Sequence, residues 1–303
     1  MTILATEGLT KRYPRVTALD RLTVSAGPGV TGLVGANGAG KSTLIKILLG
    51  LLEPTAGRAE VLGMDCATEA LAIRRVVGYM PEHDCLPPDI SATEFVIHMA
   101  RMSGIPLTAA RERAADTLRH VGLYEERYRP IGGYSTGMRQ RVKLAQALVH
   151  DPRVVFLDEP TNGLDPQGRD DMLALVRRIG TEFGISVVVT SHLLGELERI
   201  CDHVIVIDGG RLLRSSSITE FTRATETITV EVEDGQDALL ARLTEAGEEA
   251  VRHRRLLAVQ VRSEATFDAV RDAVCDLGLS LVRLERVRGS IEDVFRGELE
   301  EVR

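Results

Sequence analysis

A glycine-rich segment carries the clearest chemical signal in the sequence. Residues 35–42 read Gly-Ala-Asn-Gly-Ala-Gly-Lys-Ser, which satisfies the phosphate-loop pattern of glycine, four residues, glycine, lysine and serine. Glycines let the main chain wrap closely around a polyphosphate, so that successive N–H groups point at its oxygens. The lysine then reaches the β- and γ-phosphates, and the serine hydroxyl is a ligand for Mg²⁺. The residues predicted to bind a nucleotide here are Gly35, Asn37, Gly38, Gly40, Lys41, Ser42 and Thr43.

Two adjacent carboxylates supply the acidic groups that phosphoryl transfer needs. Asp158 and Glu159 follow an apolar run at 154–157. An aspartate in this position can hold the coordination shell of Mg²⁺, and the glutamate beside it can orient and partly deprotonate an attacking water. The alternative is that the pair simply ends a strand. Because the phosphate loop lies in the same chain, the sequence favours the catalytic interpretation.

Strands and helices must position these side chains. Residues 22–34 predict two short strands around a Gly-Pro-Gly turn, and the glycine-rich loop leads from them into an apolar helix at 43–52. Further apolar strands are predicted at 154–157 and 185–190. Polar groups follow the carboxyl ends of these strands, which indicates an α/β domain with a parallel sheet and a site at that edge.

The pattern becomes helical between about residues 87 and 130. Ser91 and Glu94 have the spacing of a capping box at the start of an apolar helix, and 108–121 is a second amphipathic stretch. The sequence therefore predicts an all-helical insert in the α/β domain.

From residue 225 onward the pattern changes again. Alternating strands and amphipathic helices indicate a small α+β domain of β-α-β-α-β order, a ferredoxin-like half, followed by a final helix at 291–301. Its charges alternate with apolar positions, as on solvated faces, and form no catalytic constellation. The serine run at 215–217 is the predicted hinge before this domain.

A further segment identifies the kind of phosphate-loop protein. Tyr134-Ser135-Thr136-Gly137-Met138-Arg139-Gln140-Arg141 stands at the start of a helix, whose positive end can meet an anion. An ordinary helix cap is the alternative on the local sequence alone. Together with the phosphate loop and the acidic pair, the segment resembles the signature of the nucleotide-binding subunit of an ABC transporter, with threonine and methionine in place of the commoner glycine and glutamine. The resemblance covers residues 1 to about 220.

The resemblance implies a P-loop NTPase fold and roles for further residues. It implies an ABC ATP-binding domain at 1–220, with a helical signature subdomain at about 87–150, and leaves the α+β domain at 225–303 as an accessory domain. Tyr13 resembles the aromatic that stacks on adenine, Asp165 belongs to the loop that crosses the dimer interface, and His192 resembles the histidine that contacts the γ-phosphate.

One position departs from the family pattern. Glu82 follows Pro81 where a glutamine normally touches Mg²⁺ and the attacking water. Because a carboxylate keeps the oxygen acceptor, Glu82 is interpreted as the functional counterpart, and a solvated loop carboxylate is the alternative. The implied catalytic residues are Glu159, His192 and Lys41, and the implied metal ligands are Ser42, Asp158 and Glu82.

The resemblance also implies a mechanism and partners. Two subunits, identical chains or paralogues, would close head to tail over two Mg-ATP, with Ser135 and Gly137 of one subunit acting on nucleotide held by the other. ATP hydrolysis would drive transport through a separate transmembrane permease. The segment at 289–295 resembles the end of exporter-type subunits for drugs, lipids or ions.

Composition limits the remaining classes of function. The 303 residues carry a net charge of −7, which argues against a nucleic-acid partner. No apolar run approaches the roughly 18 residues of a spanning helix, and the N-terminus lacks a signal-peptide pattern. Together with the permease that the resemblance implies, this predicts a peripheral protein at the cytoplasmic face of the cell membrane. A soluble ABC ATPase that acts as an assembly or regulatory switch is the alternative function, and ligand sensing is the alternative role of residues 225–303.

Overall fold

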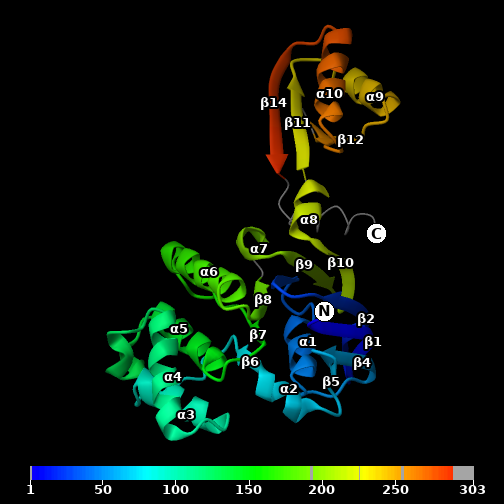
Figure 1. The fold of residues 1–303 in the computed structure, drawn as a ribbon. Helices are drawn as coiled ribbons and strands as arrows, with labels where there is room; N and C mark the ends of the chain where they lie inside the picture. The colour runs from blue at the N-terminus through cyan, green and yellow to red at the C-terminus, as the bar shows by residue number, and fades with distance from the viewer. Residues whose placement is uncertain (1, 192–193, 225, 254–255, 289–303) are drawn as a thin grey trace. The chain divides into compact units, whose positions relative to one another are not determined.

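The computed structural model describes residues 2–191, 194–224, 226–253 and 256–288 (Figure 1). The chain divides into two compact units, Met1–Ser216 and Ser217–Arg303, which we call unit 1 and unit 2 and describe separately.

Unit 1 contains two sheets. One has the strand order β2-β1-β4-β5, with antiparallel neighbours. The other has the order β10-β9-β3-β8-β7-β6, and its strands from β9 to β6 are parallel. The strands are β1 (Leu4–Tyr13), β2 (Val16–Ala26), β3 (Val30–Val34), β4 (Ala56–Val61), β5 (Met64–Asp65), β6 (Val77–Met80), β7 (Val154–Leu157), β8 (Ser186–Ser191), β9 (His203–Asp208) and β10 (Arg211–Ser217).

The parallel sheet confirms the predicted α/β class. Every residue of β3, β7 and β8 is buried, as expected for strands covered on both faces. The carboxyl ends of these strands lie at one edge, where the glycine-rich loop and the acidic pair follow them.

The helix after the glycine-rich loop packs into the core of unit 1. Helix α1 (Lys41–Leu48) buries Leu44, Ile45, Ile47 and Leu48. The helix ends before residue 52, which was its predicted end. Gly50 terminates it by adopting a left-handed conformation with a φ of 61°, and the Gly50 N–H donates to the main-chain oxygen of Ile47. The other helices of unit 1 are α2 (Ala70–Val76), α3 (Ala92–Met102), α4 (Leu107–His120), α5 (Thr136–Leu148), α6 (Pro166–Thr181) and α7 (Leu194–Ile200), with 3₁₀ turns at Glu126–Tyr128 and Ile131–Gly133.

Helices α3, α4 and α5 pack against one another and form the predicted helical insert (Figure 1). The capping box of α3 is present: Ser91 Oγ accepts from the Glu94 N–H at 3.2 Å, and Glu94 Oε2 accepts from the Ser91 N–H at 2.8 Å. The side-chain and main-chain hydrogen bonds of Ser91 lower the pKa of Glu94. Within the described ranges, no helix has the length and apolar character needed to cross a bilayer.

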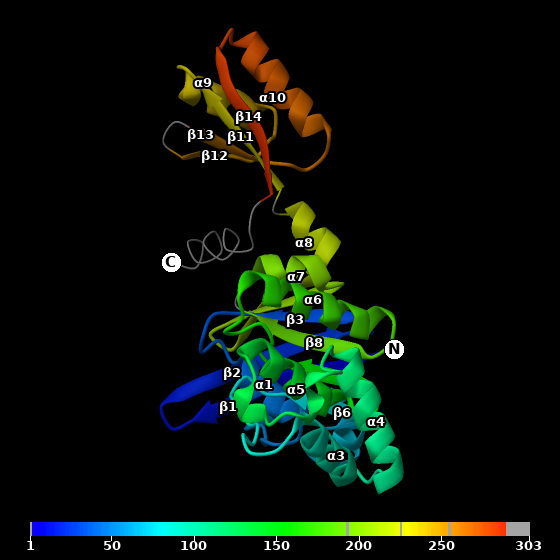
Figure 2. The same cartoon turned by 90° about the vertical axis from the view of Figure 1, so that its left-hand side faces the viewer.

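Unit 2 has an antiparallel sheet of order β12-β13-β11-β14 with α9 and α10 packed on it (Figure 2). Its elements are α8 (Ile218–Ala224), β11 (Glu226–Val232), α9 (Gln236–Glu245), β12 (Ala250–His253), β13 (Leu256–Gln260), α10 (Ala265–Asp276) and β14 (Leu281–Arg288). The order from β11 to β14 is β-α-β-β-α-β, the split βαβ of ferredoxin-like folds. The edge strand β12 was not predicted, because its four residues are too few to show a clear alternation and Val251 in it is 59% exposed. The predicted helix at 291–301 and the exporter-like segment at 289–295 lie outside the described residues.

Candidate functional site

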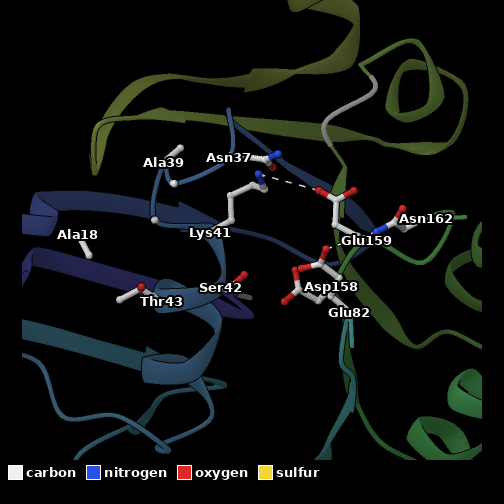
Figure 3. A pocket seen from close by; sticks show the side chains of 12 residues that line it. Ala18, Asn37, Ala39, Lys41, Ser42, Thr43, Glu82, Asp158, Glu159 and Asn162 are labelled. Carbon is white, nitrogen blue, oxygen red and sulfur yellow. Dashed lines mark hydrogen bonds and ion pairs between the residues drawn. The ribbon is translucent and has the colours of Figure 1, made fainter. Parts of the chain in front are cut away.

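A cavity of about 390 Å³ opens where β3, β6 and β7 end (Figure 3). Three loops that are far apart in the sequence meet there: the phosphate loop after β3, the segment after β6 and the acidic pair after β7. The lining residues are Ala18, Asn37, Gly38, Ala39, Gly40, Lys41, Ser42, Thr43, Glu82, Asp158, Glu159 and Asn162. The structure thus brings together most of the predicted phosphate and metal residues.

The positions of the phosphate loop require glycine for different structural reasons. A Cβ on Gly35 would lie 2.4 Å from the main-chain oxygen of Ile207, and one on Gly40 would lie 2.4 Å from that of Ala18. Gly38 has a φ of +87°, and a Cβ there would meet nothing within 4 Å. Gly35 therefore needs glycine for close packing and Gly38 for a left-handed turn beside open space, whereas Gly40, with a φ of +105°, needs it for both reasons.

The Lys41 ammonium lies at the inner end of the phosphate loop. The residue is 7% exposed, and its Nζ donates to the main-chain oxygens of Gly35 at 2.6 Å and Ala36 at 3.2 Å. Glu159 Oε1 lies 3.9 Å from the same nitrogen. A buried ammonium held in this way is a fixed positive charge beside the glycine-rich loop, which suits a polyphosphate.

A threonine on the neighbouring strand holds the acidic pair. Asp158 is 3% exposed and Glu159 6% exposed. Thr190 Oγ1 donates to Asp158 Oδ1 at 2.8 Å and accepts from the Glu159 N–H at 2.8 Å. Glu159 also has a φ of 50°, which is uncommon for a residue other than glycine and is typical of strained functional positions. Thr190 was not among the residues predicted from the sequence.

Glu82 points into the same cavity as Asp158 (Figure 3). Its Oε1 accepts from Asn162 Nδ2 at 3.4 Å, and its main-chain oxygen accepts from Lys143 Nζ at 2.8 Å. The residue therefore belongs to the cavity rather than to a solvated loop surface.

The donor set fits a Mg²⁺ ion that arrives with phosphates. Ser42, Asp158 and Glu82 line one cavity, but no group of three or more His, Cys, Asp or Glu in the described part of the chain could hold a metal alone. Mg²⁺ in phosphoryl-transfer sites is held by one or two carboxylates, with water and substrate phosphates completing its shell. These residues match that arrangement.

Two titratable groups near the acidic residues have displaced pKa values. Burial raises the pKa of Tyr79 to about 12, and the charge of Asp158 acts in the same direction. Burial lowers the pKa of Lys143, while Cys85, Asp84 and Glu82 act in the opposite direction. In both cases burial of the side chain itself is the first cause, and the neighbouring charges come second.

The signature residues lie in a different place. Ser135, Gly137 and Asp165 line a second cavity of about 530 Å³. Ser135 caps α5 by accepting from the Met138 N–H at 3.3 Å, and Asp165 caps α6 by accepting from the Gly168 N–H at 3.0 Å. Two helix N-termini, with their positive ends, therefore meet at this second cavity.

Three predicted residues are not placed in either cavity. Gly35 begins the phosphate loop but is not among the lining residues. Tyr13, at the end of β1, is 42% exposed and is not among the lining residues; Lys11 Nζ lies 5.5 Å from its ring centroid. His192 lies outside the described residues.

Similarity to known proteins covers much more of the chain than the candidate site. The sequence profile of the ABC transporter family matches residues 19–162. The ABC transporter ATP-binding protein YxlF of Bacillus subtilis is 32% identical over 97% of this chain and 98% of its own length. The daunorubicin resistance ATP-binding protein DrrA3 of Streptomyces coeruleorubidus is 35% identical over 97% of this chain and 95% of its own length. The structure of cbiO1 from Clostridium perfringens, part of the ABC transporter complex cbiONQ, is 28% identical with a TM-score of 0.66, over 73% of this chain and 90% of that one. Similarity to the first two proteins therefore runs through both units.

Proposed function

Because the chain belongs to the ABC transporter ATP-binding family and is an ATPase of that family, we propose that it powers an exporter. In this proposal it hydrolyses ATP as one half of a head-to-tail dimer and acts through a separate transmembrane permease. The observation that carries the proposal is the division of the motifs. Phosphate and acidic residues share one cavity, whereas Ser135, Gly137 and Asp165 line another.

Hydrolysis follows from the groups around the first cavity. Glu159 orients a water and takes its proton as the water attacks the γ-phosphorus in line, while the bond from that phosphorus to the β-phosphate oxygen breaks and ADP leaves. Lys41 and the loop N–H groups stabilise the charge that spreads over the phosphate oxygens. Ser42, Asp158 and Glu82 would hold Mg²⁺, which neutralises charge on the β- and γ-phosphates when bound. His192 is assigned to the γ-phosphate on its sequence position.

The second cavity supports the composite site. Ser135 and Gly137 lie at the N-terminus of α5, which attracts an anion, yet they line a different cavity from the phosphate loop of their own chain. In a head-to-tail dimer, the nucleotide bound by the second subunit meets this cavity. The second cavity of that subunit meets the nucleotide bound by the first.

A mixing experiment tests this dimer. We expect Lys41→Met and Ser135→Ala to be nearly inactive when each is purified alone, because each variant spoils both composite sites of its homodimer. Mixed dimers contain one site with both defects and one intact site, so mixing restores ATP hydrolysis. If the mixture stays as inactive as its components while the wild type hydrolyses ATP, the head-to-tail arrangement is wrong.

The export direction and the membrane partner rest on the family relatives. DrrA3 is named for daunorubicin resistance, and its similarity covers nearly the whole chain. The permease is proposed to dock at the helical insert near Glu82, which places the protein peripherally at the cytoplasmic face of the membrane. Co-purification with membranes that contain the permease, and its loss in their absence, tests this location.

Replacing Glu82 tests its role as a metal and water ligand. We expect Glu82→Ala to lower ATP hydrolysis about 10-fold and to raise the Mg²⁺ concentration needed for half-maximal rate, because an oxygen ligand is lost. Glu82→Gln keeps a carbonyl oxygen and should recover part of the rate. Asp84→Ala, which removes an exposed carboxylate from the same segment, is the matched control. Unchanged hydrolysis and Mg²⁺ dependence in Glu82→Ala would mean that Glu82 is not a ligand for Mg²⁺ or for the attacking water.

A further inference from the structure

Helix α5 places a buried ammonium directly behind the Glu82 segment. Lys143 is 3% exposed, and its Nζ donates to the main-chain oxygen of Glu82 at 2.8 Å. The chain contains only four lysines, at positions 11, 41, 46 and 143, so a buried lysine is not a chance result of high lysine content. Burying an ammonium is costly unless the group makes specific interactions, and the hydrogen bond to Glu82 is one.

The same face of α5 also holds the segment on the other side of Glu82. Gln140, one turn before Lys143, donates from Nε2 to the main-chain oxygen of Asn162 at 3.1 Å. Asn162 in turn donates from Nδ2 to Glu82 Oε1 at 3.4 Å. Lys143 therefore holds the main chain of Glu82, while Gln140 holds the residue that contacts the Glu82 side chain.

The hydrogen bond of Lys143 goes to a main-chain oxygen, so its effect is on the position of the segment. Glu82 follows β6 and Pro81, which cannot donate a main-chain hydrogen bond. A charge-assisted hydrogen bond immediately after this point limits where the Glu82 side chain can start. Without it, the Glu82 carboxylate has more freedom to leave the cavity that it shares with Asp158.

We propose that Lys143 is a positioning residue for ATP hydrolysis, which holds the Glu82 carboxylate in the phosphate cavity through the main-chain oxygen of Glu82. The inference rests on the proposed function, because it takes Glu82 as the ligand for Mg²⁺ and water. It adds a residue outside the phosphate loop, the signature segment and the acidic pair.

A double-mutant cycle between Lys143 and Glu82 tests the proposal. The full chain is assayed for steady-state hydrolysis over ranges of ATP and Mg²⁺ concentration. We expect Lys143→Met to lower kcat about 5-fold and to raise the Mg²⁺ requirement, with little change in KM for ATP. In the Glu82→Ala background the same substitution should change kcat by less than about 2-fold, because no carboxylate remains to be positioned.

Lys46→Met is the matched control, since Lys46 lies exposed on α1, and it should behave as the wild type. The proposal is overturned if Lys143→Met is as active as the wild type, or if it lowers kcat by the same factor with and without Glu82. If Lys143→Met has no cooperative melting transition, Lys143→Gln, which removes the charge and shortens the side chain, takes its place in the cycle. A wild-type chain without ATP hydrolysis would instead overturn the proposed function.

Discussion

Glu159→Gln is expected to bind Mg-ATP as the wild type does, but its rate of ATP hydrolysis should fall by at least about 100-fold. Glutamine has nearly the shape of glutamate but cannot take a proton from water at neutral pH. The main chain at this residue is fixed independently of the side chain, because the Glu159 N–H donates to Thr190 and the position is 6% exposed. The substitution should therefore remove the base and leave the cavity intact.

The loss of hydrolysis in Glu159→Gln should also change how long the dimer stays closed. If hydrolysis reopens the closed dimer, a variant that binds but does not hydrolyse ATP should accumulate as a dimer when Mg-ATP is added. Single-turnover hydrolysis and size-exclusion chromatography with Mg-ATP measure the two effects. Glu182→Gln, which removes an exposed ion pair with Arg178 at the end of α6, is the control. It should hydrolyse ATP at the wild-type rate and should not accumulate as a dimer. Turnover close to the wild-type rate in Glu159→Gln would remove this residue from the role of base.

The phosphate cavity was largely predictable because its parts are contiguous or lie at strand ends. The phosphate loop supplies seven neighbouring candidates, and the acidic pair follows a fully apolar strand. A parallel sheet brings the carboxyl ends of its strands to one edge. The residues after these strands can therefore be expected to lie close together before any distance between them is known.

Thr190 could not be found in this way, because its role depends on strand register. The pairing of β7 with β8 sets Leu157 opposite Val189, so the next residues along each strand, Asp158 and Thr190, become neighbours. In the sequence, Thr190 is simply the polar residue near the end of an apolar strand. Its hydrogen bonds to both members of the acidic pair appear only once the register is known.

Lys143 was missed for a related reason. The pattern of α5 predicts an apolar side made of Val142, Ala145 and Leu148, and a lysine next to such a side is normally solvated. In the structure the residue is 3% exposed because the Glu82 segment lies against it. A contact between residues 61 positions apart leaves no trace in helical periodicity.

Lys41→Met is expected to lower ATP hydrolysis by about 100- to 1,000-fold and to weaken Mg-ATP binding, because it removes the fixed positive charge from the phosphate cradle. It also removes the donor that holds the main-chain oxygens of Gly35 and Ala36. Lys41→Arg should fail as well, since a planar guanidinium is larger than the ammonium buried at 7% exposure between those oxygens.

Calorimetric titration with Mg-ATP separates this effect from a defect in the dimer. Ser135→Ala should also block turnover, yet a single chain that carries it should bind Mg-ATP normally, because Ser135 lines the other cavity. Loss of binding in Lys41→Met together with retained binding in Ser135→Ala would assign the first cavity to a chain's own nucleotide and the second to its partner's. Equal binding in both variants would contradict that assignment, since the two residues would then contribute alike to holding the nucleotide.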